Sequence, residues 1–68
     1  MQQRRLKFAI QIVRMLSEVE GPRIIQSWLI GLNPELGDRV PLKLMREGDL
    51  ETVGPEIMGA ARAFHAGG

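Results

Sequence analysis

The side chains that could act as nucleophiles in this 68-residue chain are Ser17, Ser27 and Thr52, and none of them has the single histidine nearby in sequence. Nucleophilic catalysis requires a base within hydrogen-bond reach of the nucleophile. We interpret Ser27 as a hydroxyl on a helix surface. His65 is expected near a helix C-terminus, where the helix dipole favours its protonated form, and we interpret it as a solvated residue. The sequence therefore predicts no catalytic residues and no enzyme.

The sequence also offers few residues that could bind a metal or a cofactor. The chain has no cysteine, so neither a disulfide nor a thiolate metal site is possible, and one histidine has no second imidazole to share a metal with. Glu47, Asp49 and Glu51 lack the spacing of a calcium loop and are interpreted as a solvated acidic junction between helices. The glycines at 31, 37 and 48 are expected to end helices and do not form a phosphate-binding loop. We predict neither a metal ion nor a cofactor.

The length of the chain sets the domain organisation. Sixty-eight residues make one domain, residues 1–68, which buries roughly 60% of the surface of the unfolded chain. Folds of this size usually need a disulfide, a metal or a partner for stability. Because the first two are missing from the sequence, we favour association with another chain.

Charge and hydropathy limit the possible partners and the location of the protein. The formal net charge is +1, which disfavours a general nucleic-acid binder. Residues 1–23 carry five cationic side chains against two acidic ones, whereas residues 24–68 carry four against six. No apolar run reaches the ~18 residues of a membrane span, and Gln11 and Arg14 interrupt the apolar stretch after the basic start. We therefore predict a cytoplasmic protein.

Residues 2–19 have the period of one amphipathic helix with an unusually wide apolar arc. Lys7, Gln11, Arg14 and Glu18 form a narrow polar stripe. The apolar residues fill two neighbouring sectors: Leu6, Ala9, Ile10, Val13 and Leu16 form the first, and Phe8, Ile12, Met15 and Val19 form the second. Together they exceed the ~100° that a surface helix normally buries. Either the rest of the domain wraps this helix, or part of the arc meets another protein chain.

Proline and glycine divide the remainder into short elements. Pro22 begins a second helix that ends near Ile30, with Gly31 as a left-handed cap. Residues 32–40 form a loop in which Gly37 supplies a positive φ and Leu36 points inward. Pro41 begins a short helix that ends at Glu47, and Gly48 stops it.

Asp49 is expected to cap the last helix, with Glu51 in its first turn. Pro55 cannot donate to the carbonyl of Glu51, so we expect either a kink or a turn followed by a fresh helix over residues 55–65. The result is an all-α fold, a small bundle of about four helices. Its predicted core is Phe8, Ile12, Val13, Leu16, Ile25, Trp28, Leu29, Leu36, Leu44, Val53, Ile57 and Phe64.

Two surfaces are candidates for binding. Arg4, Arg5, Lys7 and Arg14 offer cations for phosphate, but no recognition helix is readable, and we interpret Arg4 and Arg5 as a frayed start. Trp28 could be a core centre or an interface anchor. The last helix carries the small residues Gly59, Ala60, Ala61 and Ala63, which would let another backbone approach closely.

One ordered series of residues is more specific than any of these features. The run W-L-x-x-x-N-P-x-L-G-x-x-x-P-L-x-L-x-x-x-G-D-L-E-x-V extends from Trp28 to Val53. It resembles the toxin-binding domain of Xre/MbcA/ParS-type antitoxins, and the match covers residues 22–68, about two-thirds of the chain. The residues that carry it include Trp28, Asn33, Pro34, Gly37, Pro41, Gly48 and Val53, together with Leu29, Leu36, Leu42 and Leu44.

The resemblance implies a helical unit that neutralises a RES-domain toxin, an enzyme that consumes NAD. In such antitoxins the C-terminal residues block the NAD pocket, and dimers are common. The toxin-binding residues implied here are Arg62, Phe64, His65, Gly67 and Gly68. The N-terminal helix, residues 1–20, would provide dimerisation.

The chain departs from the pattern in three places. About one helix precedes the motif where many members carry a helix-turn-helix, so we do not expect DNA binding to repress an operon. Val40 replaces a small polar residue before Pro41, and Gly54-Pro55 interrupts a helix that usually continues. The alternatives to an antitoxin are a DNA-binding or architectural module that uses the basic first helix, and a homodimeric structural module.

Overall fold

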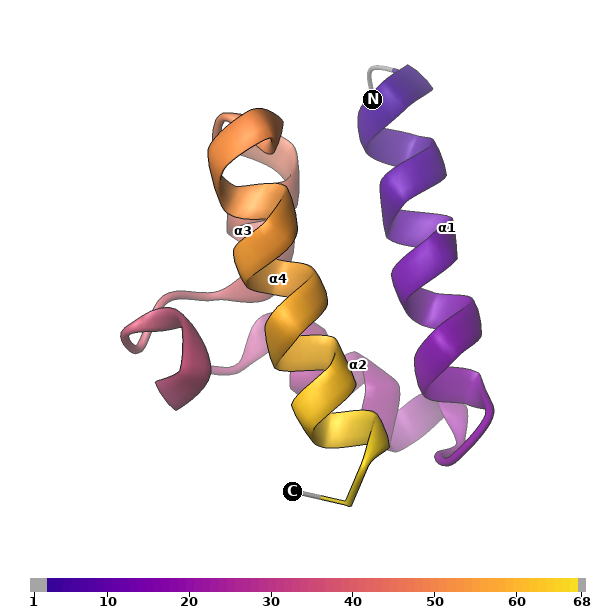
Figure 1. Cartoon of the computed structure of the whole chain (residues 1–68). Coiled ribbons are helices and arrows are strands. Elements are labelled where there is room, and N and C mark those ends of the chain that lie inside the picture. Colours follow the sequence, from indigo (N-terminus) through magenta and orange to yellow (C-terminus); the bar gives the residue numbers. More distant parts are fainter. Residues whose placement is uncertain (1–2, 68) are drawn as a thin grey trace.

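The computed structural model describes residues 3–67, which contain four α-helices and one turn of 3-10 helix (Figure 1). The elements are α1 (Gln3–Ser17), α2 (Pro22–Ile30), η1 (Pro34–Leu36), α3 (Pro41–Glu47) and α4 (Leu50–His65). An isolated antiparallel bridge between Asn33 and Arg39 closes the loop around η1. The prediction of a small all-α domain is confirmed. No helix among these residues is long and apolar enough to cross a membrane.

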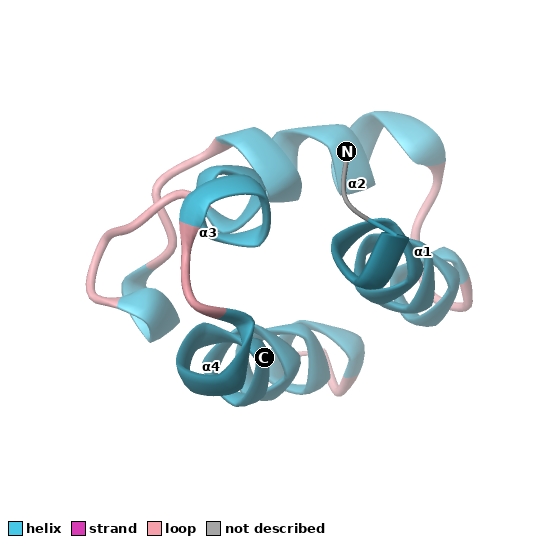
Figure 2. Cartoon of the chain, turned by 90° about the horizontal axis from the view of Figure 1, so that it is seen from above, coloured by secondary structure: helices cyan, strands magenta, loops and turns pink. Residues whose placement is uncertain are grey.

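Helices α1 and α4 lie side by side and run in the same direction, with α2 and α3 packed behind them (Figures 1 and 2). A polar side-chain contact joins them near each end. Arg4 Nη2 lies 3.7 Å from Glu51 Oε1 near the start of both helices, and His65 Nε2 lies 2.8 Å from Glu18 Oε1 near their ends. The two exposed pairs mark the register between the helices.

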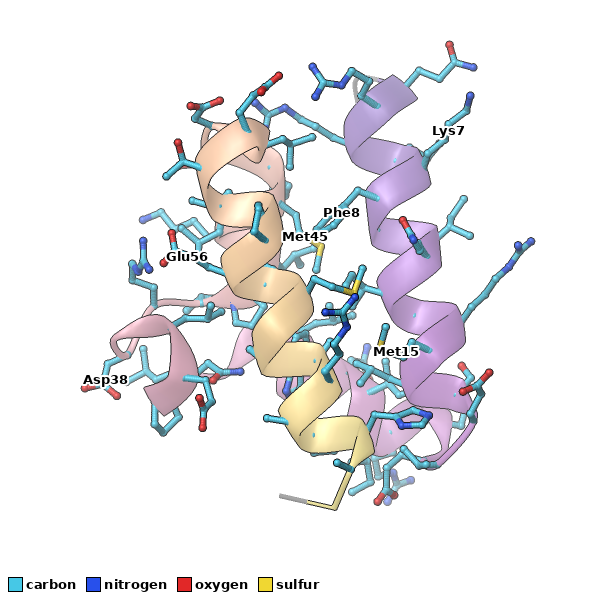
Figure 3. All side chains as sticks on the ribbon, in the orientation of Figure 1. Lys7, Phe8, Met15, Asp38, Met45 and Glu56 are labelled. Atoms are coloured by element: carbon cyan, nitrogen blue, oxygen red, sulfur yellow. The ribbon has the colours of Figure 1, made fainter. Side chains whose placement is uncertain are left out.

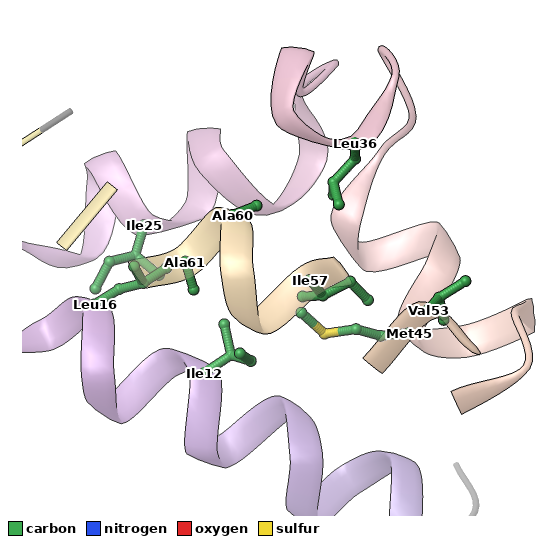
Figure 4. Close-up of a cluster of buried hydrophobic side chains, with 9 residues drawn as sticks. All are labelled: Ile12, Leu16, Ile25, Leu36, Met45, Val53, Ile57, Ala60 and Ala61. Atoms are coloured by element: carbon green, nitrogen blue, oxygen red, sulfur yellow. The ribbon is translucent and has the colours of Figure 1, made fainter. Parts of the chain in front are cut away.

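The core lies where these helices converge (Figure 4). Of the predicted core residues, Ile12, Leu16, Ile25, Leu36, Val53 and Ile57 are buried. The other predicted residues, Phe8, Val13, Trp28, Leu29, Leu44 and Phe64, are half-buried and pack against that cluster. Met45, Ala60 and Ala61 complete the buried cluster and were not predicted. Two small alanines on α4 allow its backbone to approach the neighbouring helices, which closes the core of a short chain.

Proline begins three of the elements. Pro22, Pro34 and Pro41 each occupy the first position of a helix, where the missing N–H costs nothing because that group has no partner within the helix. The expected bounds of α2 and α3 are confirmed. Val40 provides no side-chain cap to α3, as its hydrocarbon side chain predicts.

Side-chain caps precede η1 and α4. Asn33 Oδ1 accepts a hydrogen bond from the amide of Glu35 at 2.9 Å, and Asp49 Oδ1 accepts one from Glu51 at 3.3 Å. Thr52 Oγ1 also donates to Asp49 Oδ2 at 3.0 Å. The predicted role of Asp49 is confirmed.

The glycines at helix ends act in different ways. Gly37 has the expected positive φ of 65°. The expectation of a left-handed cap at Gly31 is wrong, because its φ is −89°. A Cβ at Gly31 would lie 2.9 Å from the carbonyl oxygen of Ser27, and one at Gly48 would lie 2.7 Å from that of Leu44. Gly31 and Gly48 therefore provide space for a close approach of the backbone.

Helix α4 continues through Pro55, so the alternative of a turn followed by a fresh helix is wrong. Pro55 lies in the second turn and removes only the amide that would bond to Glu51. Glu51 is at the surface, where water can satisfy its carbonyl. Gly54 has no Cβ for the proline ring to meet, which eases the helical conformation before proline. At the other end of the fold, α1 stops at Ser17, two residues before the expected Val19.

Candidate partner-binding face

The last turn of α4 contains most of the residues that the sequence nominated for partner binding. Arg62 is exposed, whereas Phe64 is half-buried and packs against the core. The ring centroids of Phe64 and Trp28 are 6.3 Å apart, with 53° between the ring planes. This tilted contact fixes the end of α4 against α2. Gly68 lies outside the described residues.

His65 and Gly67 end the helix in defined positions. His65 is half-exposed and makes the contact with Glu18. Gly67 has a φ of 86°, and its amide donates to the carbonyl of Phe64 at 3.0 Å. A left-handed glycine of this kind turns the backbone away from the helix axis. The residues from Arg62 to Gly67 therefore form an ordered surface that combines a cation, an imidazole and a thin backbone.

A groove with both polar and apolar lining opens beside Ala63 and Phe64. Its floor is the Trp28–Phe64 contact, and its other lining residues are Ser27, Gly31, Leu32, Asn33, Pro34, Glu35 and Ala63. Two large apolar side chains on or next to it are strongly exposed: Leu32 is 72% exposed and Ile30 is 61% exposed. We use the name C-terminal face for the end of α4 from Arg62 to Gly67 together with this groove, which opens on the side of Ala63 and Phe64, whereas His65 is turned toward Glu18.

Sequence reasoning missed the exposed Leu32 in the lining of the groove and the exposed Ile30 at the end of α2. The helical period does indicate that Ile30 is exposed, because on a helical wheel it lies away from the side shared by Ile25 and Leu29. Leu32 follows the helix end at Gly31, where periodicity gives no information about direction. Both become noticeable only when their exposure is known.

Two of the four small residues of α4 are packed in the core. Ala60 and Ala61 are buried within this chain, so the interpretation of all four small residues as an approach for another backbone is wrong for these two. Gly59 is exposed and Ala63 is half-buried in the wall of the groove. A partner could approach the backbone closely at those two positions.

Two of the three candidate nucleophiles have local structural partners. Ser17 Oγ donates to the carbonyl of Val13 at 2.7 Å, and the Thr52 hydroxyl bonds to the capping carboxylate of Asp49. Ser27 lines the groove. Within residues 3–67, no three histidine or acidic side chains are grouped so that they could hold a metal ion.

The cations of α1 are divided between two roles. Two side-chain contacts hold the start of α1 against the rest of the fold. The Arg5 guanidinium donates to the carbonyl of Met45 at 2.9 Å, and Arg4 pairs with Glu51. The interpretation of a frayed start is therefore wrong. Arg5 is half-buried and turned toward α3, whereas Lys7 and Arg14 are exposed. The four cations thus do not form a single face for phosphate.

The motif residues have structural positions around the loop and the groove. Asn33 is 7% exposed; besides its cap, its backbone amide donates to Arg39 and its carbonyl accepts from Leu36 and Asp38. Pro41 and Val53 are buried, and Gly48 fits against the side chain of Val53. This part of the motif therefore specifies the fold of the loop that supports the C-terminal face.

Comparison of the chain with protein-family models, with curated proteins and with solved structures finds no match.

Proposed function

We propose that this protein is a non-catalytic antitoxin that binds a RES-type, NAD-consuming toxin and blocks its active site with the end of α4. The contacting residues would be Arg62, Phe64, His65, Gly67 and Gly68, as the resemblance implies. The observation that supports the proposal is the end of α4, where Arg62 is exposed and the neighbouring Phe64 is anchored on Trp28.

Obstruction makes specific physical demands on such a surface. It requires no reactive group, but the blocking element must keep its shape when it enters a pocket, since ordering a flexible segment would reduce affinity. Contact with Trp28 anchors Phe64, and the hydrogen bond to Phe64 fixes Gly67. Arg62 supplies the cation that would match a cleft lined by acidic residues.

Homodimerisation through α1 is part of the same proposal. Leu6 is 47% exposed and Ile10 is 43% exposed, and the two are one helical turn apart on the outer side of α1. The core of this chain covers Ile12 and Leu16 and leaves this pair to solvent. A second copy that packs α1 against α1 would bury the pair.

Inhibition of a purified RES-type toxin tests the proposal directly. NAD consumption is followed with increasing amounts of the wild-type chain, and we expect it to stop when the chain is in excess. Arg62→Glu should weaken inhibition by at least about tenfold, which corresponds to ~1.4 kcal/mol. Arg46→Glu on α3 reverses one exposed cation elsewhere and is the matched control. A toxin that stays fully active with the wild-type chain in excess would exclude the proposed function.

A further inference from the structure

A second groove lies between α1 and α4, at the opposite end of α4 from the C-terminal face. It is lined by Arg4, Lys7, Phe8 and Gln11 from α1 and by Leu50, Gly54, Pro55 and Met58 from α4. Figure 3 shows Phe8 pointing from α1 toward α4, whereas Lys7 points away from the core. None of the proposed antitoxin contacts uses this groove. We call it the α1/α4 groove.

The chemistry of this groove is divided between its floor and its edge. Phe8, Leu50 and Met58 are half-buried, so each retains apolar surface after packing on the core. Pro55 adds an exposed ring. Gly54 adds no side chain between the helices, and a Cβ there would be 4.0 Å from the Phe8 ring. The floor is therefore apolar and carries an adaptable thioether.

The edge is cationic. Arg4 and Lys7 are both exposed, and no acidic side chain is among the lining residues. Arg4 is partly neutralised by Glu51 at 3.7 Å, so Lys7 provides most of the uncompensated charge. Arg14 continues the charge along α1, where it borders a shallow depression together with Lys7 and Gln11. A ligand that fits both features is apolar on one side and acidic beside it.

The length of the groove suits a short helix as the ligand. Residues 4–11 of α1 and 50–58 of α4 each extend about 10–12 Å along their axes, which is the length of about two helical turns. Two neighbouring helices accept a third helix in the groove between their side-chain ridges. Since residues 3–67 form no sheet edge, an extended peptide would find no strand to pair with.

We infer that the α1/α4 groove binds an acidic amphipathic helix of a partner protein, with its apolar side chains on Phe8, Leu50 and Met58 and its carboxylates beside Lys7 and Arg4. The contact covers about two turns, so the interface is small and affinity for an isolated helix is modest. The inference does not rest on toxin binding, because the α1/α4 groove and the end of α4 use different residues.

The test uses the full chain and stapled helical peptides as probes. The first peptide has Leu at i, i+4 and i+7 with flanking Glu, the second replaces each Glu by Lys, and the third replaces each Leu by Ser. Affinity is measured by fluorescence polarisation, and the bound position by NMR shifts of the Phe8 ring and the Met58 methyl. We expect the first peptide to bind and to shift both signals. The other two should bind at least about tenfold more weakly.

Charge reversal at the edge provides the matched comparison. Lys7→Glu should weaken binding of the first peptide about tenfold, whereas Lys43→Glu, which reverses an exposed cation on α3, should leave it unchanged. Helicity and unfolding midpoints of both variants show whether they fold. Equal effects of the two variants would overturn the inference, as would absence of binding at about 1 mM peptide.

If the α1/α4 groove binds a ligand other than an acidic helix, the same measurements give different results. Each of these results would also overturn the inference. A second copy of the chain would shift Phe8 and Met58 when the protein is concentrated without peptide. Duplex DNA as the true ligand would shift the same signals with a steeper loss of affinity as salt is raised. Stronger binding of the second peptide than of the first would exclude an acidic partner.

Discussion

His65 Nε2 on the last turn of α4 lies 2.8 Å from Glu18 Oε1, just beyond the end of α1. The pair joins residues that are 47 positions apart in the chain. It lies at the opposite end of the α1–α4 contact from the Arg4–Glu51 pair. His65 therefore connects the proposed blocking surface to the helix that is proposed to form the dimer.

The His65–Glu18 pair should contribute little to stability. The two side chains are 37% and 69% exposed, so water and salt screen their attraction. In a double-mutant cycle with His65→Gln and Glu18→Gln, we expect a coupling free energy below about 1 kcal/mol in urea unfolding, which decreases as salt is added. A coupling above about 2 kcal/mol would mean that the pair is a main attachment of α4.

The contact between Phe64 and Trp28 should matter more. Phe64 is half-buried and packs on the core, so Phe64→Ala should reduce the free energy of unfolding by about 2–3 kcal/mol. Phe64→Leu keeps most of the apolar volume and should cost less than about 1.5 kcal/mol. Urea unfolding measures both. A neutral Phe64→Ala would show that the end of α4 is not anchored by this ring.

Much of this fold could be predicted because local signals agree with one another. Proline at the first position set the bounds of α2 and α3, and the side chain of Asp49 marked the start of α4. The helical period identified Ile12, Leu16 and Ile57 as buried. These are short-range effects that a sequence expresses directly.

The remaining features depend on contacts between distant residues. Met45 is fully buried, yet α3 is too short to fix which of its apolar residues points inward. The role of Gly31 follows from a nearby carbonyl and not from its φ. At the candidate site, the exposure of Ile30 and Leu32 depends on how α2 and the following loop meet α4, which no periodicity specifies.

Asn33 should be essential to the loop that supports the C-terminal face. Its buried side chain caps η1, so Asn33→Ala should cost about 1–2 kcal/mol in the free energy of unfolding. Asn33→Ser keeps an oxygen that can accept from the amide of Glu35 and should recover part of this loss. The comparison is made by urea unfolding. Equal losses for the two variants would show that the cap is not the cause.

Substitution by alanine should change the free energy of unfolding in opposite directions at Gly59 and Gly48. Gly59 is exposed within α4, and a Cβ there would have no neighbour within 4 Å, so Gly59→Ala should raise the free energy of unfolding by about 0.5–1 kcal/mol. A Cβ at Gly48 would lie 2.7 Å from the Leu44 carbonyl oxygen and 3.0 Å from a methyl of Val53, so Gly48→Ala should lower it by about 1–3 kcal/mol. Urea unfolding of both variants compares the signs. Neither glycine has a positive φ, so the expected effect of each added Cβ depends on the space around it. A destabilising Gly59→Ala would contradict this expectation.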